Sequence, residues 1–242
     1  MHDTPKIRLY VDHPLADGED VSLSRAQAHY LFAVMRLRCK DQLCLINGRD
    51  GAWRGVVTQA DKRGGTLQVV EQLQPMQFPP DLWLLFAPIK KARTDFIVEK
   101  AAEMGAARIC PVQTAYTNAE RVRHDRLQAH AIEAIEQCGG TFVPEVAELA
   151  PLDQVLRDWP NDRRLVFADE TLAGSHAILQ ETDAKKWAVL IGPEGGFAAE
   201  ERSRLLSLPF VSPVSLGPRI LRADTAAVAA LTLIQSIWGD WT

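Results

Sequence analysis

Two stretches of the sequence place glycine and proline beside residues that can do chemistry. The first, LIGPEGGFAAEE, covers residues 190–201, and the second, SLGPRILRADTAAVAAL, covers residues 215–231. Each Gly-Pro corner follows an apolar run and precedes a segment of helical character. If the two runs are parallel strands of one sheet, their carboxyl ends share an edge, and ligands collect at such edges. The repeated corner therefore predicts two loops that line one pocket.

The residue types in these loops narrow the class of ligand. Neither GxxxxGK[ST] nor GxGxxG, the patterns of phosphate-binding loops, is present in them. Glu194 in the first loop repels a phosphate but attracts hydroxyls or a cation. In the second loop, Leu216, Ile220 and Leu221 suit the faces of a flat base, and Arg222 suits an anion. The pair favours an uncharged or positively charged adenosine derivative. The alternative is that the glycines only make tight turns and the alanines only pack.

The first part of the chain has the pattern of a small β-barrel. Residues 1–73 contain short apolar runs separated by glycine turns, and one helix is expected over residues 24–37 with Ser24 as its N-cap. Prolines at positions 75, 79 and 80 then mark residues 74–80 as a linker.

Residues 81–242 alternate between buried strands and helices. LWLLFAPI is a continuous apolar run typical of a strand buried on both faces, and further strands are expected at RICPV, RLVFADE, WAVLIG and PVSLG. Helices are expected at TDFIVEKAAEMG, DRLQAHAIEAIEQCGG, around SHAILQE, at AAEERSRLLS and at TAAVAALTLIQSIW, the last capped by Asp224 or Thr225. The alternation predicts an α/β domain with a largely parallel sheet.

Composition narrows the class of protein further. The net charge of −4 divides into +3 for residues 1–126 and −7 for residues 127–242, and a basic first half is compatible with a polyanionic partner. The four cysteines lack the spacing of a zinc site, and no apolar run approaches the roughly 18 residues of a membrane span. The first residues lack the apolar stretch of a signal peptide. We therefore expect reduced thiols, no metal, no membrane partner and a cytoplasmic location.

The loops and several other segments resemble one known family. IGPEGGF and LGPRILRADTA resemble the two signature loops of the RsmE group of SPOUT methyltransferases, which use S-adenosylmethionine to methylate N3 of a uridine in 16S ribosomal RNA. LSRAQAHYLFAVMRLRCKDQLCLING, KKARTDFIVEKAAEMGAARICPV and EAIEQCGGTFVPEV resemble further segments of the group. The resemblance covers nearly the whole chain.

The resemblance implies both a fold and a partner. The fold is α/β, with a PUA-like RNA-binding β-barrel over residues 1–73 and a SPOUT domain containing a deep trefoil knot over residues 81–242. The implied partners are 16S ribosomal RNA in the small ribosomal subunit and a second copy of the chain, joined through the SPOUT domain. The residues implied to bind S-adenosylmethionine are Leu190, Ile191, Gly192, Glu194, Gly195, Gly196, Leu216, Gly217, Ile220, Leu221 and Arg222.

Three positions depart from the pattern of the family. Asp224 stands where the family usually has glutamate, and Gly139-Gly140 stands where an arginine is common. The stretch QTAYTN, residues 113–118, lacks the expected Thr-Glu-Arg-Ser-like run.

Methyl transfer from a sulfonium is an in-line displacement, so positioning supplies most of the catalysis. Because N3 of uridine carries a proton at neutral pH, we consider Arg222 for stabilising the uridine anion and Asp224 or Glu194 for accepting the proton. Each also has a simpler interpretation, in which Arg222 orients a loop, Asp224 caps a helix and Glu194 binds ribose. The candidate RNA contacts are Arg8, His29, Arg36, Arg38, Lys90, Lys91, Arg93, Arg121, Arg123 and Arg126. His29 taken by itself favours a half-buried structural residue over a base contact.

Two other functions remain open at this stage. One is a non-catalytic RNA-binding or ribosome-assembly factor with a degenerate methyltransferase domain, which Asp224 and the missing arginine favour. The other is an enzyme of the same fold that methylates a ribose 2′-hydroxyl, for which no Asn-plus-Arg motif is evident near the N-terminus.

Overall fold

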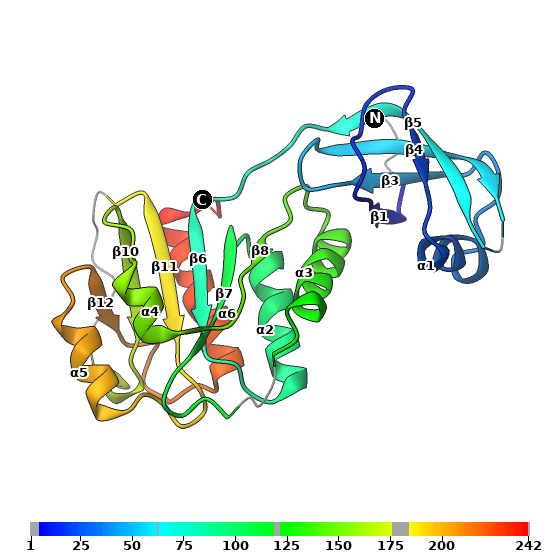
Figure 1. The fold of residues 1–242 in the computed structure, drawn as a ribbon. Helices are drawn as coiled ribbons and strands as arrows, with labels where there is room; N and C mark the ends of the chain where they lie inside the picture. Colours follow the sequence, from blue (N-terminus) through cyan, green and yellow to red (C-terminus); the bar gives the residue numbers. More distant parts are fainter. Residues whose placement is uncertain (1–4, 62, 119–121, 176–183, 242) are drawn as a thin grey trace. The chain divides into compact units, whose positions relative to one another are not determined.

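The computed structural model describes residues 5–61, 63–118, 122–175 and 184–241. The chain divides into two compact units, one of Met1–Phe78 with Ile135–Val143 and the other of Pro79–Ala134 with Pro144–Thr242. Figure 1 shows the elements of both units. No helix among the described residues is long and apolar enough to cross a membrane.

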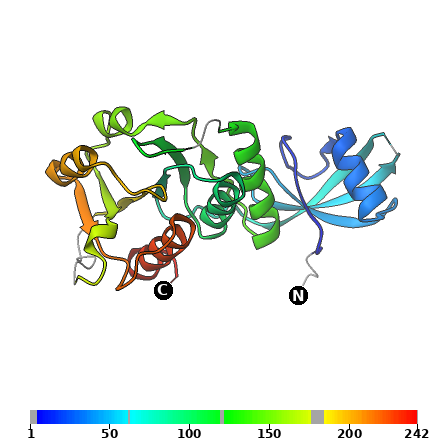
Figure 2. The same cartoon turned by 90° about the horizontal axis from the view of Figure 1, so that it is seen from below.

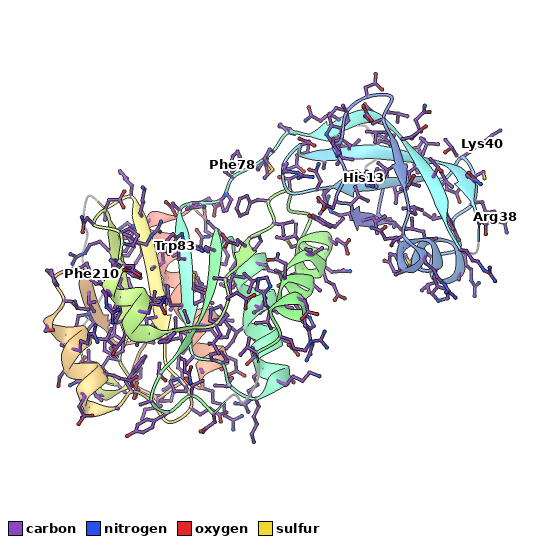
Figure 3. The ribbon with its side chains drawn as sticks, in the orientation of Figure 1. His13, Arg38, Lys40, Phe78, Trp83 and Phe210 are labelled. Atoms are coloured by element: carbon purple, nitrogen blue, oxygen red, sulfur yellow. The ribbon has the colours of Figure 1, made fainter. Side chains whose placement is uncertain are left out.

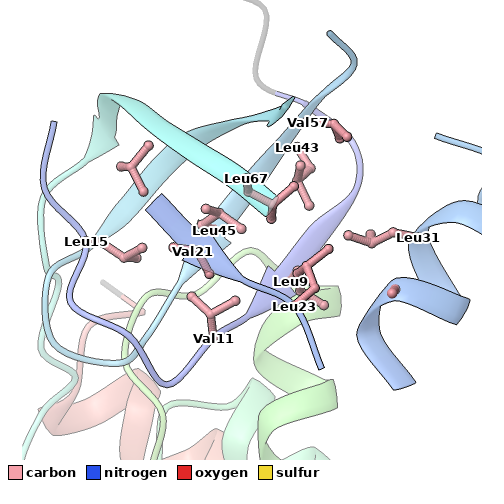
Figure 4. Packing of buried hydrophobic residues seen from close by; sticks show 12 residues of the cluster. Leu9, Val11, Leu15, Val21, Leu23, Leu31, Leu43, Leu45, Val57 and Leu67 are labelled. Atoms are coloured by element: carbon pink, nitrogen blue, oxygen red, sulfur yellow. The ribbon is translucent and has the colours of Figure 1, made fainter. Parts of the chain in front are cut away.

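The first unit is built on a five-stranded sheet in the order β1-β3-β4-β5-β2. Its strands are β1 (Arg8–Tyr10), β2 (Asp20–Ser22), β3 (Gln42–Ile46), β4 (Ala52–Ala60) and β5 (Gly65–Gln74). β1 pairs with β3 in parallel and the other pairs are antiparallel, with three register shifts between β4 and β5. Such shifts bend a sheet. The inward side chains form a leucine- and valine-rich core that includes Leu9, Leu43 and Leu67 (Figure 4).

The helical segment of this unit begins where the sequence predicts and ends earlier. Ser24 is the N-cap of α1 (Arg25–Ala28), and its hydroxyl accepts a bond from the Gln27 N–H at 3.3 Å. The Gln27 side chain accepts a bond from the Ser24 N–H at 2.9 Å, which completes a capping box. A π-helical segment, η1 (His29–Val34), follows. The predicted continuation to residue 37 is wrong, because Arg36 has a φ of 61° and leaves the helix.

The second unit contains a parallel sheet in the order β12-β10-β11-β6-β7-β8, and β9 pairs with β7. Its strands are β6 (Leu82–Phe86), β7 (Arg108–Gln113), β8 (Glu145–Val146), β9 (Ala150–Pro151), β10 (Arg163–Ala168), β11 (Lys186–Ile191) and β12 (Val211–Val214). Every recorded pair is parallel, which confirms the expected sheet. The central strands contain continuous apolar runs, such as LVFA in β10 and WAVLI in β11, because both of their faces are covered.

Helices lie on both faces of this sheet. They are α2 (Lys91–Glu103), α3 (His124–Cys138), α4 (Leu152–Arg157), α5 (Ala199–Ser207) and α6 (Ala223–Trp238), with a 3-10 turn, η2 (Glu170–Leu172). α4 and α5 cover one face, and α6 covers the other together with α2, against which it packs (Figures 1 and 2). The helix expected around SHAILQE falls mainly on residues 176–183, outside the described residues.

Aromatic rings fix the amino-terminal end of the central strands. The Trp159 ring stacks on the Phe210 ring at 5.3 Å and lies edge-on to Trp83 at 6.4 Å; Trp83 and Phe210 are labelled in Figure 3. The buried Arg163 guanidinium lies 3.7 Å from the centre of the Trp83 ring and forms an ion pair with Asp81 at 2.7 Å. A buried charge is tolerated there because it is paired and bonded.

The E-Q segment at the end of α3 has a structural role in the first unit. The Glu136 carboxylate accepts a hydrogen bond from the Tyr10 N–H in β1 at 2.6 Å. Arg8 donates to the Gly140 carbonyl at 2.5 Å. Arg8, one of the candidate RNA contacts, thus donates a hydrogen bond to the Gly139-Gly140 segment, where an arginine is common in the family.

Candidate functional site

The two Gly-Pro corners line a single cavity, as the sequence predicts. The cavity has a volume of about 300 Å³, a size seen in small-molecule sites. It lies beyond the carboxyl ends of β10, β11 and β12, which are neighbours in the parallel sheet. Predicted cofactor residues that line it are Ile191, Gly192, Glu194, Gly196, Leu216, Gly217, Ile220, Leu221 and Arg222.

Two predicted cofactor residues, Leu190 and Gly195, lie outside the lining. Leu190 is fully buried within β11, one residue before the strand ends. A Cβ built on Gly195 would lie 3.4 Å from the Tyr116 Cβ. A methyl group at Gly195 would therefore lie in ordinary van der Waals contact with Tyr116.

Gly196 is a residue of the first corner whose backbone conformation favours glycine. Its φ is +70°, and its N–H donates to the Pro193 carbonyl at 2.9 Å, which closes the turn. A Cβ at Gly196 would lie 2.0 Å from Oε1 of Glu170. Both the backbone conformation and the close approach of a carboxylate exclude a side chain.

The second corner differs in one detail from the sequence prediction. β12 ends at Val214, so Gly217 lies in a loop and not at the end of a strand. The Ser215 hydroxyl accepts a bond from the Gly217 N–H at 3.3 Å, and the Gly217 carbonyl accepts one from the Gly174 N–H at 3.0 Å. These hydrogen bonds hold the loop in place although it pairs with no strand. Gly217 has a φ of +114°, which favours glycine.

The predicted cap of the final helix is wrong. Arg222 occupies the N-cap position of α6, and its side chain makes no capping bond. Asp224 lies in the first turn, where its carboxylate accepts a bond from the Thr225 N–H at 2.9 Å. The helix starts earlier because Ala223 already has helical geometry. A carboxylate in the first turn still interacts favourably with the helix dipole.

A third loop, which sequence reasoning missed, completes the cavity. Ala168, Asp169, Glu170 and Ala173 line it from the end of β10. Asp169 is buried; its carboxylate accepts bonds from the Thr171 N–H at 3.0 Å and from Arg202 at 2.9 Å. The sequence feature that indicates this loop is the acidic pair Asp169-Glu170 at the end of the buried run RLVFADE. It has no glycine corner, which is why it was not predicted.

Arg93 joins the two carboxylates proposed from the sequence as proton acceptors. Its guanidinium lies 3.0 Å from Oε1 of Glu194 and 3.6 Å from Oδ2 of Asp224. Glu194 lines the cavity, so the three side chains mark one edge of it. Arg93, a candidate phosphate contact, is thus engaged by carboxylates.

The other candidate RNA contacts fall into two groups. In the first unit, the exposed candidates are Arg36, Arg38 and His29 (Arg38 is labelled in Figure 3). The half-buried interpretation of His29 is therefore wrong. The buried residue of η1 is Leu31. In the second unit, Lys90 and Lys91 are exposed, while Arg123 pairs with Asp125 at 2.5 Å and Arg126 pairs with the buried Asp95. Arg121 lies outside the described residues.

No group of three or more metal-binding side chains occurs among the described residues. All four cysteines are free, and burial raises the pKa of Cys110 to about 11. Neither observation adds a reactive group to the cavity.

Comparison with known proteins shows the family. The RNA methyltransferase domain matches residues 76–235, and the RNA methyltransferase PUA domain matches residues 23–70. The chain belongs to this RNA methyltransferase family. Its first unit accordingly contains a PUA-like domain, and the cavity lies within the matched methyltransferase domain.

Individual members of the RNA methyltransferase family match nearly end to end. The ribosomal RNA small subunit methyltransferase E of Rickettsia conorii is 29% identical over 232 residues, which cover 94% of each chain. That of Synechocystis is 32% identical and covers 90% of this chain and 73% of the relative. The crystal structure of the Neisseria gonorrhoeae enzyme bound to S-adenosylmethionine superposes with a TM-score of 0.87, at 26% identity, over 98% of this chain and 99% of that one.

Proposed function

We propose that this chain is an S-adenosylmethionine-dependent methyltransferase that modifies N3 of a specific uridine in 16S ribosomal RNA of the small ribosomal subunit. The observation that carries the proposal is the cavity, whose lining combines apolar walls with three carboxylates and two arginines and, among the described residues, contains no lysine. A phosphate-free sulfonium nucleoside fits such a lining better than a nucleotide does. The relatives' names and the cofactor in the Neisseria structure support the same reading.

The residues present fit this cofactor. Leu216, Ile220 and Leu221 provide apolar surface for the adenine, and Glu170 and Glu194 provide acceptors for hydroxyl or ammonium groups. At Gly217, no described atom lies within 4 Å of the position that a Cβ would take, so the space beside the backbone is open. When bound, S-adenosylmethionine supplies an electrophilic methyl group. We assign its binding to the predicted residues that line the cavity, with Leu190 and Gly195 supporting them from positions next to the lining.

The chain's own groups act on the uridine. We assign Arg222 to stabilise the negative charge that develops when N3 loses its proton. Glu194 or Asp224 accepts that proton. Arg93 holds both carboxylates at one edge of the cavity, which fixes where the proton goes.

The proposal extends to the organisation of the chain. Residues 1–73 act as an RNA-binding β-barrel, residues 74–80 as a linker and residues 81–242 as a SPOUT domain with a deep trefoil knot. The strand order and the return of α6 onto α2 and β11 support such threading. The RNA is held through Arg8, His29, Arg36, Lys90, Lys91, Arg93, Arg121 and Arg123, in the cytoplasm, where ribosomal subunits assemble.

We also propose a homodimer through the methyltransferase domain, and predict its response to one change. Leu233 and Ile237, one turn apart on α6, are 41% and 46% exposed, and Phe96 on the adjoining α2 is 40% exposed. Leu233→Asp places a charge in this apolar face and should give a monomer in analytical ultracentrifugation, whereas the wild-type chain sediments as a dimer. The control is Leu206→Asp on α5, where Leu206 is 42% exposed. A wild-type monomer, or a dimer of the Leu233 variant, would contradict the assignment.

Calorimetric titration with S-adenosylmethionine tests the cofactor half of the proposal. We expect one site per chain. A chain that binds no S-adenosylmethionine would be a non-catalytic RNA-binding or assembly factor.

A further inference from the structure

Tyr116 is an exposed aromatic residue on a loop that is held firmly in place. It lies in the segment after β7 and is 49% exposed. The Thr114 N–H donates to the Thr117 hydroxyl at 2.8 Å, and the Thr117 N–H donates to the Thr114 carbonyl at 3.1 Å. These bonds close a tight turn with Tyr116 at its tip.

A second set of bonds ties this turn to the edge of the cofactor cavity. The Ala115 N–H donates to Oε1 of Glu201 at 2.8 Å, and Oε2 of Glu201 accepts a bond from the Ala198 N–H at 3.1 Å. Glu201 therefore links the turn to the start of α5, directly after the first Gly-Pro corner. The turn that carries Tyr116 is thus positioned by the fold before any ligand binds.

Tyr116 also packs against the corner itself. The Cβ position of Gly195 lies 3.4 Å from the Tyr116 Cβ and 3.8 Å from its Cγ and Cδ2. The two neighbours of Gly195, Glu194 and Gly196, both line the cofactor cavity. Tyr116 thus lies beside a residue whose two neighbours in the sequence form part of the wall of the cavity in which a methyl donor would be bound.

A separate cavity connects this loop with two cationic side chains. Asn118, two residues after Tyr116, lines a separate cavity of about 520 Å³ together with Lys90 and Lys91. Both lysines are exposed, so they can meet the phosphates of a nucleotide chain. Aromatic rings that stack on bases and cationic side chains that meet phosphates together bind unpaired nucleotides.

We propose that Tyr116 is the platform on which the target uracil stacks at the mouth of the cofactor cavity. The inference rests on the proposed function and names the residue that positions the acceptor base. A base that undergoes chemistry must leave its stack, and an aromatic ring replaces the stacking that it loses. Tyr116 stands in the segment that departs from the family's Thr-Glu-Arg-Ser-like run, so this chain uses a ring there.

The test compares three variants of the full-length chain. Tyr116→Leu keeps apolar bulk over Gly195 but removes the ring, whereas Tyr116→Phe and Tyr116→Trp keep a ring. The substrate is small ribosomal subunits from a strain that lacks its own copy of the gene. We expect the Leu variant to raise KM for subunits about tenfold or more, as loss of a stacked base does. The Phe and Trp variants should stay near wild type, and all three should bind S-adenosylmethionine with wild-type affinity.

The outcomes separate the inference from the proposed function. A Leu variant with a wild-type KM would overturn the stacking role, as would a parallel loss of S-adenosylmethionine affinity, which would make Tyr116 a support of the corner. A wild-type chain that transfers no methyl group to the subunits would overturn the proposed function, and the inference with it.

Discussion

Replacing Gly196 by alanine should weaken binding of S-adenosylmethionine by about tenfold or more, since a left-handed backbone costs a non-glycine residue about 1–2 kcal/mol. The added Cβ would also lie 2.0 Å from the Glu170 carboxylate. The Glu170 carboxylate, which itself lines the cavity, must therefore move away, and the strained corner relaxes from the conformation that forms the wall. Isothermal titration calorimetry measures the effect.

Gly195 provides the matched control for this prediction. Its Cβ would meet Tyr116 at 3.4 Å, and Gly195 is not among the glycines with a positive φ. Gly195→Ala should therefore bind S-adenosylmethionine within about threefold of wild type, because the added methyl group makes only ordinary van der Waals contact with Tyr116 and Gly195 does not line the cavity. Circular dichroism establishes that both variants are folded. Equal affinities of the two variants would show that the corner does not form the binding site as described.

The second large effect is expected at Arg222. Arg222→Ala should lower kcat by about 100-fold or more, the range seen when a group that stabilises a developing anion is removed. Arg222 lines the cavity from the N-cap of α6, and within the described residues it forms no ion pair that would neutralise it. Arg222→Lys should recover part of the rate because it restores the charge without the planar guanidinium. Single-turnover methyl transfer measures the chemical step.

Arg219 is the control for Arg222, because it lines the same cavity and carries the same charge. Arg219→Ala should change the single-turnover rate by no more than about threefold, since cations away from the developing charge contribute little. Equal losses in the two variants would indicate that the rate depends on the number of cations in the lining and not on the position of Arg222. Loss of S-adenosylmethionine affinity without loss of rate in the Arg222 variant would make Arg222 a cofactor contact.

Regular apolar patterns were the most reliable guide to the fold. The continuous run LWLLFAPI predicts β6, and the alanine-rich helix at the end of the sequence predicts α6. Shorter elements were missed: β8 and β9 have two residues each and α4 has six, too few for a period to show. η1 was missed for a different reason, because the pattern of apolar residues does not distinguish a π-turn from an α-turn.

The part of the site that the sequence did not predict is the set of contacts between loops that lie far apart in the chain. The two corners were predicted to share a cavity because parallel strands end at one edge. The loop carrying Asp169 and Glu170 was overlooked because it has no glycine corner, although it lies between the other two in the sheet order. The orientation of Gly195 toward Tyr116 depends on where β7 ends relative to β11, and sequence spacing does not contain that information.

The central claim is that this chain places a methyl group on N3 of a uridine in 16S ribosomal RNA. The most direct measurement deletes its gene and analyses the nucleosides of 16S RNA by mass spectrometry, with the plasmid-borne gene as the control. We predict that one 3-methyluridine is lost on deletion and restored by the plasmid. Unchanged 3-methyluridine would contradict the claim, and loss of a 2′-O-methylated nucleoside in its place would show that the enzyme acts on ribose.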